Sequence, residues 1–493
     1  MANRLSSNHR PALAAIGAAL LAITATACAP RALPASFPTT SPASPAAAAA
    51  PPAPVGAALA EGPPLPGEPA ARWPGLSDDA RAIPKEPLTA DAAVRLALRD
   101  NRALRASLQE IGVARGELDQ AGLPPNPTVS IDLRRTQTAG ESIRAGFAVE
   151  YDLTRAILVP QRADAARADL EAARHRAAAA VVTTGYEARA AFFALQAAAA
   201  RHAVGVRVLD AFAAGRDAAR ALFAAGNIPE LDVTTQEAAY EDARVTVAQL
   251  ELEELDRREA LNRLLGLHGE QTSWPLAGAL PPAPDRLDLP ADLEQAAIRS
   301  SLTLAEMKSR LEATARRAGL ARTEGWLPDV SLTVNADHDG PAWTIGGGAR
   351  FTLPLFDRKQ GTVAARAAEF DAQIERYQGA AVDIRSAARE ARNRVVSTHA
   401  RARHYQEVVV PARRRVLEQA LLQYNGMQIG VFQLLAARRD QLGAELASID
   451  ALRDFWTARA ALDALLAGQR VGVSTPTASP SLGSSTSDAS GGH

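Results

Sequence analysis

The sequence predicts a mainly α-helical protein with a small β part, built from two copies of one module. Three observations support this prediction. Landmarks within residues 88–470 recur at a spacing of about 201 residues, each copy contains one very long helical stretch, and each contains a pair of short strands. Aromatic residues make up only 4% of the chain, and alanine is abundant. Because alanine combines the highest helix propensity with little bulk, this composition favours long, closely packed helices.

The repeat is visible as matching segments. Asn126–Ile131 aligns with Leu327–Leu332, and Leu264-Leu265 aligns with Leu465-Leu466. This spacing is far longer than the units of solenoid proteins, so it indicates two copies of a large module. The expected organisation is a signal peptide at 1–28, a linker at 29–87, a first repeat at 88–270, a linker at 271–290, a second repeat at 291–470 and a disordered tail at 471–493.

A short helix is expected to open the first copy, over residues 89–122. Thr89 is a suitable N-cap, and Asp91 falls in the first turn, where the helix dipole favours a carboxylate. Gly122 and Pro124-Pro125 then end the helix. We expect the second copy to begin in the same way.

Two strands follow in each copy, at 127–135 and 142–153 in the first. Apolar and polar side chains alternate along them, which gives a strand one apolar and one polar face. The apolar positions are Ile143, Ala145, Phe147, Val149 and Tyr151 in the first copy, and Val330, Leu332, Val334, Trp343, Ile345, Gly347, Ala349, Phe351 and Leu353 in the second. Short polar connections are expected at Thr136–Glu141 and Asp337–Pro341.

The helices after the strands are unusually long, from about Pro160 to Ala224 and from about Lys359 to Tyr424. At 1.5 Å per residue each spans about 100 Å. The returning helices, about 230–266 and 431–467, are only half as long. A short helix stacked end to end on a return helix matches the length of a long helix. The sequence therefore predicts an antiparallel helical column with strands at one end and helix turns at the other.

Four strands are too few to close a barrel, yet their alternation requires an apolar environment on one face and a polar one on the other. A barrel without edges needs about 8 or more strands. Three chains would supply twelve, about the number found in mid-sized barrels. We therefore expect a trimer that joins the strands of its three chains into one barrel.

The N-terminus has the organisation of an export signal. An apolar stretch from Pro11 to Ile23 follows two arginines and is too short to span a bilayer. The only cysteine, Cys28, comes directly after small residues and resembles the acylated cysteine of a bacterial lipobox, although Ala25 stands where leucine is usual. Lipidation of Cys28 and simple cleavage near Ala27 are the two interpretations. The Pro- and Ala-rich linker after it is expected to act as a semi-extended tether.

Charge and motifs exclude several classes of protein. Lys and Arg number 54 and Asp and Glu 55, so the basic excess of a nucleic-acid binder is missing. One cysteine permits neither an intrachain disulfide nor a Cys-based metal cluster. No stretch of about 20 apolar residues follows the N-terminus. His338, between Asp337 and Asp339, is the one metal-like group, but we expect an ordinary loop there. We find no enzyme motif and expect no cofactor, no metal and no catalytic residue.

At this point the chain resembles the TolC-type outer-membrane efflux family over all of residues 88–470. The resemblance rests on the two-fold repeat, on Pro127 and Pro328 at the strand starts, on Leu353-Pro354-Leu355-Phe356, and on the turns Phe223–Pro229 and Tyr424–Phe432. The second turn, followed by Gln433-Leu434-Leu435, is similar to the CzcC-like branch that serves heavy-metal efflux.

The resemblance implies a homotrimer, lipid-anchored in the outer membrane. Its strands form a 12-stranded β-barrel in the membrane, and its helices form an antiparallel α-helical barrel that extends into the periplasm. Such a protein is a passive exit duct for metal ions or drugs, and it works with a periplasmic adaptor (a membrane fusion protein) and an inner-membrane pump. Two alternatives stay open: the duct of a type I protein secretion system, and a non-conducting periplasmic coiled-coil scaffold. The pump genes beside this one would separate efflux from secretion.

The resemblance also implies a closed aperture and an adaptor contact at the helix turns. The matching residues are Gly226, Asp232, Tyr424, Met427, Ile429, Gly430 and Gln433. Asp232 and Tyr424 match positions that carry polar links, whereas the family's partner arginine falls on Ile429 and its acidic constriction on Gln433 and Ala436. Asp232 has a second interpretation, an acidic residue favoured by a helix N-terminus. We expect Gly226 and Gly430 to serve the backbone of the turns.

Overall fold

The computed structural model describes residues 86–134, 144–339 and 342–472, which belong to one unit spanning Glu61–His493. The helices are α3 (Ala90–Asp100), α4 (Arg102–Ala121), α5 (Leu153–Ile157), α6 (Val159–Ala224), α7 (Glu230–Leu265), the 3-10 turn η1 (Gly269–Thr272), α8 (Leu293–Ser300), α9 (Leu302–Trp326), α10 (Gln360–His404), the π-turn η2 (Tyr405–Val409), α11 (Val410–Asn425) and α12 (Val431–Leu466). The strands are β1 (Thr128–Arg134), β2 (Arg144–Asp152), β3 (Asp329–Asp339) and β4 (Ala342–Thr352). The signal peptide with Cys28, nearly all of the linker at 29–87, the loop Thr136–Glu141 and most of the tail lie outside the described residues.

The short helix of each repeat is broken, so the expectation of one helix over 89–122 is wrong in this respect. Asn101 has extended backbone angles, φ −62° and ψ 119°, and its side chain accepts a hydrogen bond from the amide of Leu104. Ser301 does the same in the second repeat and accepts from the amide of Leu304. Because Asn and Ser satisfy the free amides at a helix start, one such residue ends α3 or α8 and begins α4 or α9.

The breaks are the places where each short helix meets its return helix. Gly266 ends α7 with φ +69°, and a Cβ at this position would lie 2.6 Å from the carbonyl oxygen of Asp100. Gly468 follows α12 with φ +104°, and its Cβ would lie 2.3 Å from the carbonyl oxygen of Ser300. Only glycine combines this backbone with so close an approach. The end-to-end stacking predicted from the helix lengths is thus formed in both repeats.

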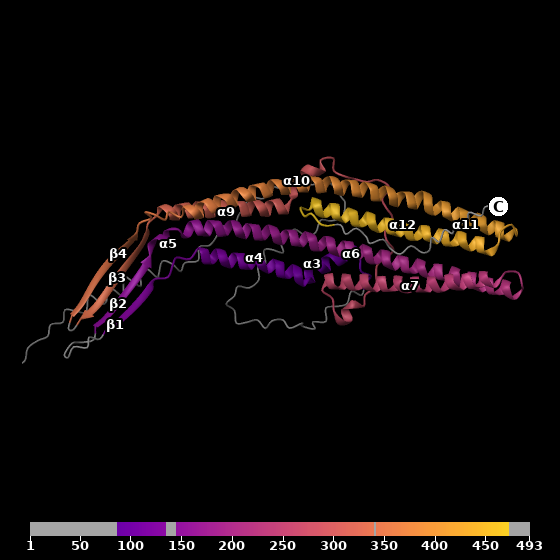
Figure 1. The fold of residues 1–493 in the computed structure, drawn as a ribbon, viewed down its shortest axis with the longest axis horizontal. Coiled ribbons are helices and arrows are strands. Elements are labelled where there is room, and N and C mark those ends of the chain that lie inside the picture. Colours follow the sequence, from indigo (N-terminus) through magenta and orange to yellow (C-terminus); the bar gives the residue numbers. More distant parts are fainter. Residues whose placement is uncertain (1–85, 135–143, 340–341, 473–493) are drawn as a thin grey trace, which may run out of the picture. The chain divides into compact units, whose positions relative to one another are not determined.

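The four strands form one antiparallel sheet in the order β1-β2-β3-β4, and both repeats contribute two neighbouring strands. The register pairs Ile131 with Phe147, Phe147 with Ala336 and Ala336 with Ile345. β3 extends to Asp339 and β4 starts at Ala342, so the expected loop over Asp337–Pro341 is wrong for its first three residues, which continue the strand. The strands lie at one end of the described unit (Figure 1).

The long helices agree with the sequence prediction and differ from each other in one place. α6 is a regular α-helix of 66 residues. Its counterpart contains the π-turn η2 just before Pro411. Proline lacks an amide hydrogen and its ring clashes with the carbonyl four residues earlier, and a wider turn relieves this conflict. The first repeat has Asp210 at the equivalent position and no such turn.

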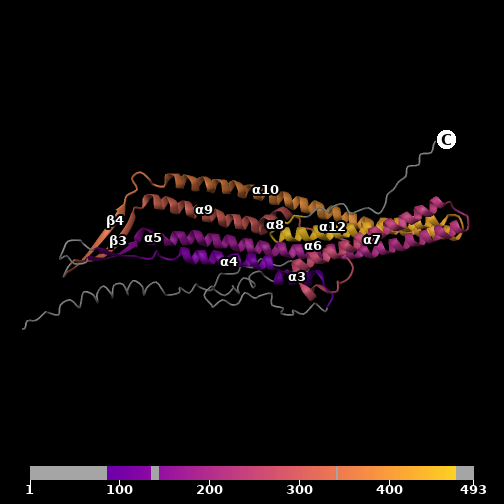
Figure 2. The ribbon, with the colours of Figure 1, turned by 60° about the horizontal axis from the view of Figure 1, so that its bottom comes forward.

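The helices are arranged in a row. Near the strands the order is α10, α9, α6, α4, and toward the helix turns it is α11, α12, α6, α7. Figure 1 and Figure 2 show α9 between α10 and α6 from two directions. α6 therefore has neighbours from both repeats, whereas α10 with α11 and α4 with α7 form the two edges of the row.

The core lies at the level where the short and return helices meet. One cluster of the first repeat packs Phe192, Leu195 and Leu261 around the start of the chain's described part. A second cluster packs Val395 and Phe455 between α8, α10 and α12. The indole of Trp274 is buried in the first cluster and donates to the side chain of Asn262 at 2.9 Å. These clusters hold the column together midway between the sheet and the turns.

Candidate functional site

The sheet has one continuous apolar face, as the alternation predicted. Residues paired across all four strands share it, among them Val129, Phe147, Val334 and Trp343. These side chains are exposed, 63% for Val129 and 57% for both Val334 and Trp343. The rings of Phe147 and Trp343 stack with centroids 6.0 Å apart. A sheet that exposes apolar side chains along its whole face needs an apolar partner.

The opposite face carries the charged side chains. Arg350 donates to Glu150 at 3.0 Å across the sheet, and Asn335 donates to Asp337 at 3.0 Å. Gly146 lies between Asp132 and Asp337 in the register, and a Cβ there would lie 2.8 Å from Oδ1 of Asp337. Sequence reasoning assigned the polar face but did not foresee this row of carboxylates, because β1 and β3 are about 200 residues apart in the chain.

His338 belongs to the apolar face rather than to a loop. It pairs with Trp343 in the register, and the two rings lie 4.8 Å apart. Asp337 points to the other face because neighbouring strand residues alternate. Among the described residues no group of three or more His, Cys, Asp or Glu side chains is placed to hold a metal ion. His338 and Asp337 are therefore separated by the strand.

The two helix turns at the far end have the same backbone but different residues. Gly226 and Met427 occupy the equivalent position, with φ +73° and +59°. In each turn the next amide, from Asn227 or Gln428, donates to a carbonyl five residues back at 2.9 Å. Glycine adopts this left-handed conformation without strain, whereas methionine does so at a cost. Met427 is 94% exposed.

Gly430 does not have the backbone role expected for it. Its φ is −79°, which any residue adopts, and it is the N-cap of α12. Its amide donates to the side chain of Gln433 at 3.3 Å, so Gln433 caps the helix start from inside. Pro229 holds the equivalent place before α7, and Ile429 is half-buried like Ile228 in the first turn.

Asp232 and Tyr424 lie near the turns but are not joined within one chain. Asp232 is half-buried in the first turn of α7, beside Glu230. Tyr424 is 39% exposed at the end of α11. Among the described residues, neither side chain makes a hydrogen bond or an ion pair. Asp232 and Gln433 are equivalent positions of the two repeats. The residues predicted for the aperture therefore lie at two turns that the repeat relates to each other.

Sequence reasoning missed a chain of charged side chains that crosses four helices. Arg201 of α6 is 5% exposed and lies 3.1 Å from Glu253 of α7 and 3.8 Å from Asp450 of α12. Arg453 of α12 then contacts Asp450 at 2.9 Å. The last pair joins Arg401 of α10 to Asp454 of α12. The residues are distant in sequence, so no spacing rule brings them together.

The buried part of this series of ion pairs shifts the pKa of one carboxyl group. Burial raises the pKa of Asp450 above its ordinary value, while Arg453 and Arg201 act in the opposite direction. A charged network in a helix interface is satisfied only when every member keeps its partner. The network therefore fixes the relative positions of α7, α6, α12 and α10 at this level.

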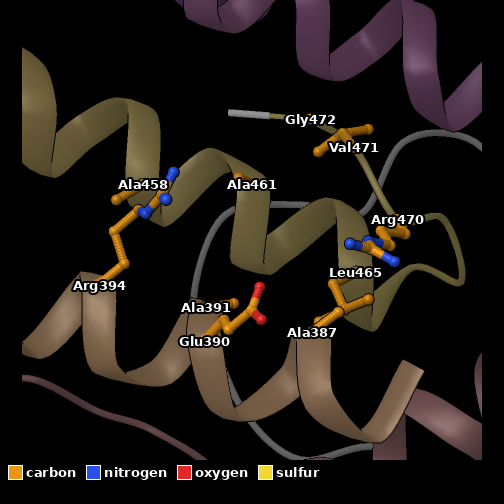
Figure 3. A pocket seen from close by; sticks show the side chains of 10 residues that line it. All are labelled: Ala387, Glu390, Ala391, Arg394, Ala458, Ala461, Leu465, Arg470, Val471 and Gly472. Carbon is orange, nitrogen blue, oxygen red and sulfur yellow. The ribbon is translucent and has the colours of Figure 1, made fainter. Parts of the chain in front are cut away.

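A small hollow lies beside this level, between α10, α12 and the segment after α12 (Figure 3). Arg394 and Arg470 lie at opposite sides of it, with Glu390 between them, and alanines of both helices form its floor. Its volume of about 140 Å³ is below the range of ordinary ligand pockets.

A larger hollow of about 580 Å³ lies at the junction of sheet and helices. Lys359 forms part of the wall of this hollow. Its backbone is left-handed, with φ +55°, and its side chain pairs with Glu324 at 2.6 Å. Phe356 and Leu355, of the motif that follows β4, are 93% and 65% exposed beside it. The junction thus combines an apolar exterior with a charged interior wall.

In the described part of the chain, none of the helices is both long enough and apolar enough to cross a bilayer.

Comparison with known proteins identifies a family. The family described as outer membrane efflux protein matches residues 93–267 and 293–468, once in each repeat. The cobalt-zinc-cadmium resistance protein CzcC of Cupriavidus metallidurans is 24% identical over 388 residues, which cover 77% of this chain and 90% of that protein.

Solved structures agree with the fold. Crystal structures of CusC match with a TM-score of 0.66 and 17% identity, over 83% of this chain and 99% of CusC. The CmeC outer membrane channel of Campylobacter jejuni matches with a TM-score of 0.64 and 18% identity, over 77% of this chain and 85% of CmeC. At these identities the likeness concerns the fold.

Proposed function

Since the chain belongs to the outer membrane efflux protein family, we propose that three copies form the exit duct of an efflux machine. The duct conducts its cargo passively from a pump and adaptor complex to the exterior, with the strands in the outer membrane and the helices in the periplasm. In this proposal the protein is a channel and not an enzyme.

The observation that carries the proposal is the open, two-faced sheet. β1 and β4 are edge strands in the order β1-β2-β3-β4, and the apolar face is exposed along its length. A sheet in a bilayer must close, because unpaired backbone groups are costly in lipid. Joining β4 of one copy to β1 of the next in three copies yields twelve strands, with the apolar face toward lipid and the face of Glu150 and Arg350 toward the pore.

The edges of the helical row support the same ring. α7 exposes Leu231, Val245 and Leu252, which are spaced by one or two heptads, at 73%, 59% and 58%. α10 and α11 expose Val382, Val396 and Leu422 at 60%, 46% and 71%. α7 carries ten acidic and four arginine side chains, whereas α10, η2 and α11 together carry seven acidic and eleven arginine side chains. Two edges of opposite charge fit each other in a head-to-tail ring.

The helix turns are the proposed aperture and the contact with the adaptor. Gly226 and Met427 form their tips, and Asp232, Tyr424, Ile429, Gly430 and Gln433 surround them. Within the described residues of one chain neither the Asp232 nor the Tyr424 side chain has a partner, so in this proposal any link between them is made across copies. Cys28 is the proposed lipid attachment, from which the linker leads to the first repeat.

The proposed cargo is a divalent metal cation. Its support is the relative CzcC, whose name refers to cobalt, zinc and cadmium resistance, and the carboxylates Asp132 and Asp337 on the proposed pore face. Acidic rings favour cations in channels. Reversal potentials across planar bilayers in gradients of ZnCl₂ and KCl measure this preference directly.

The test of the duct compares two neighbouring residues of β3. Val334→Arg places a charge on the proposed lipid face, where it costs about 2–4 kcal/mol at mid-depth. Thr333→Arg, the matched control, places the same charge on the proposed pore face. We expect the wild type and Thr333→Arg to form trimers by native mass spectrometry and to conduct in planar bilayers, and Val334→Arg to lose insertion.

A wild-type protein that stays monomeric in detergent and membranes contradicts the proposal, as does one that forms trimers without conducting. Equal insertion of Val334→Arg and Thr333→Arg contradicts the assignment of the two faces.

A further inference from the structure

The two helical hairpins carry different charge at the same distance from their turns. The second hairpin has Arg413-Arg414-Arg415 on α11 where the first has Phe212-Ala213-Ala214 on α6. α11 contains none of the buried residues of its repeat, so these arginines lie on an edge of the row. Three adjacent arginines at an edge of the row need acidic partners or water.

Within the part of the chain that the structure describes, only one of the three arginines makes an ion pair. Arg413 contacts Asp440 of α12 at 3.2 Å. Arg415 follows two residues later, about 200° around the helix, and so lies on the side away from α12. Leu422, seven residues after Arg415 and on the same side, is 71% exposed. Among the described residues Arg415 makes no ion pair.

The opposite edge presents acids in the corresponding way. Ala243 of α7 is 3% exposed and packs toward α6. Glu241 lies two residues before it, on the far side of α7, and is 59% exposed. Its partner is Arg244 of the same helix at 2.7 Å, while Asp242 makes no ion pair in the part of the chain that the structure describes. Val245 beside them is 59% exposed.

Glu241 and Arg415 lie at the same level of the column. A Cβ on Gly215 of α6 would contact Gln236 of α7 at 3.3 Å and Leu435 of α12 at 3.1 Å, so Gln236 and Leu435 share one level. α7 and α12 both run away from the turns. Five residues further along each, about 7.5 Å, are Glu241 and Asp440, and Asp440 contacts Arg413.

We propose that Arg415 of one copy pairs with Glu241 and Asp242 of the next copy. This inference rests on the ring of the proposed function and assigns it a specific contact near the aperture. The occupant of each edge is a second copy, because the two faces have opposite charge and lie at the same level. Exposed ion pairs are weak individually, and threefold symmetry repeats this one around the ring.

The first experiment is cross-linking in full-length protein. Arg415→Cys combined with Glu241→Cys is expected to give covalently linked dimers and trimers on non-reducing gels after mild oxidation, because a disulfide forms only between adjacent chains of suitable geometry. Arg415→Cys combined with Gln236→Cys is the matched control, since Gln236 lies five residues before Glu241 and faces α6. All variants retain Cys28, and each single variant shows its background.

The second experiment is charge reversal with rescue. Arg415→Glu is expected to raise the trimer dissociation constant about fivefold per interface, near the upper range for an exposed pair, and Glu241→Arg with Asp242→Arg to do the same. The combined variant is expected to return to within about twofold of the wild type, because the pair is restored in reverse. Native mass spectrometry at low and high NaCl gives the trimer fraction.

The outcomes separate the two proposals. A wild-type monomer overturns the ring and this contact with it. A wild-type trimer without the Arg415–Glu241 cross-link, or without rescue by the combined variant, overturns the contact and leaves the duct standing. A trimer in which Arg415→Glu changes ion selectivity but not stability places Arg415 in the pore and also overturns the contact.

Discussion

The two long helices occupy equivalent places in the two repeats, yet the first is buried far more extensively than the second. α6 contains 20 buried residues along its length. In the second repeat five residues of α10 are buried, and none in η2 or α11. The reason is position: α6 lies inside the row of helices and contacts both repeats, whereas α10 and α11 form an edge. Duplication of the module therefore determines which helices form, whereas their position in the row determines how deeply each helix is buried.

Single residues follow the same rule. Leu195 of α6 is 0% exposed, and its equivalent in α10, Val396, is 46% exposed. Arg201, which anchors the chain of ion pairs, corresponds to Ala402. The long helix of the first repeat thus has packed neighbours on both sides, whereas the long helix of the second repeat has them on one side. The predictions below test this difference, beginning with the largest expected effect.

The largest effect is expected for truncation inside α6. Leu195→Ala should lower the free energy of unfolding by about 2–5 kcal/mol, because it leaves a cavity in a packed core. Val396→Ala, its matched control, should cost less than about 1 kcal/mol at a partly exposed site. Circular dichroism at 222 nm during thermal unfolding of the detergent-extracted protein measures both. Equal costs at the two sites would show that the ring buries α10 as deeply as α6.

Proline exchange between the repeats comes next. Asp210→Pro should cost about 3 kcal/mol, because it removes a hydrogen bond and introduces a clash within regular helix. Pro411→Asp installs the first-repeat residue beside η2 and should change stability by less than about 1 kcal/mol. Thermal unfolding gives the stabilities, and hydrogen exchange of residues 405–411 reports whether the turn closes. An Asp210→Pro variant as stable as the wild type would contradict the view that α6 cannot accept a π-turn.

The smallest effect concerns the two tips. Gly226→Ala forces a Cβ into a left-handed backbone and should cost about 1 kcal/mol. Met427→Gly should stabilise its turn by up to about the same amount, since it removes the strain that Met427 now carries. Both residues are exposed, so packing changes little. Hydrogen exchange of Asn227 and Gln428 measures the opening of each turn, and a slower exchange at Gln428 in wild type than in Met427→Gly would refute the strain.

Periodicity and spacing predicted most of the fold. The strands, the long helices from Pro160 and Lys359, and the return helices were recognised within a few residues, because each is a local pattern. Asn101 and Ser301 are cap residues, and the sequence carried this signal within a stretch otherwise typical of continuous helix. Pro411 carried the signal for η2. Gly430 was expected to serve the backbone of its turn, but the left-handed residue is Met427, three positions earlier. The presence of a glycine alone does not show which residue of a turn is left-handed.

The sequence predicted where in the chain the candidate site lies, but it did not predict which side chains are in contact. The turns and their residues from Gly226 to Gln433 were recognised through a family resemblance, while the relation of Asp232 to Tyr424 stays a prediction about adjacent copies. The pairs Arg201–Glu253 and Arg401–Asp454 join helices more than 50 residues apart in sequence. No local rule brings such residues together.

By itself the sequence determined the repeat, the lengths of the helices and the two faces of the strands, because propensity and hydrophobic period act between near neighbours. Only the tertiary structure decided which long helix is buried, which side chains form the chain of charges, and that Arg415 and Glu241 face outward at one level. These features depend on how helices of similar composition are ordered in a row, and that order is set by packing between distant segments.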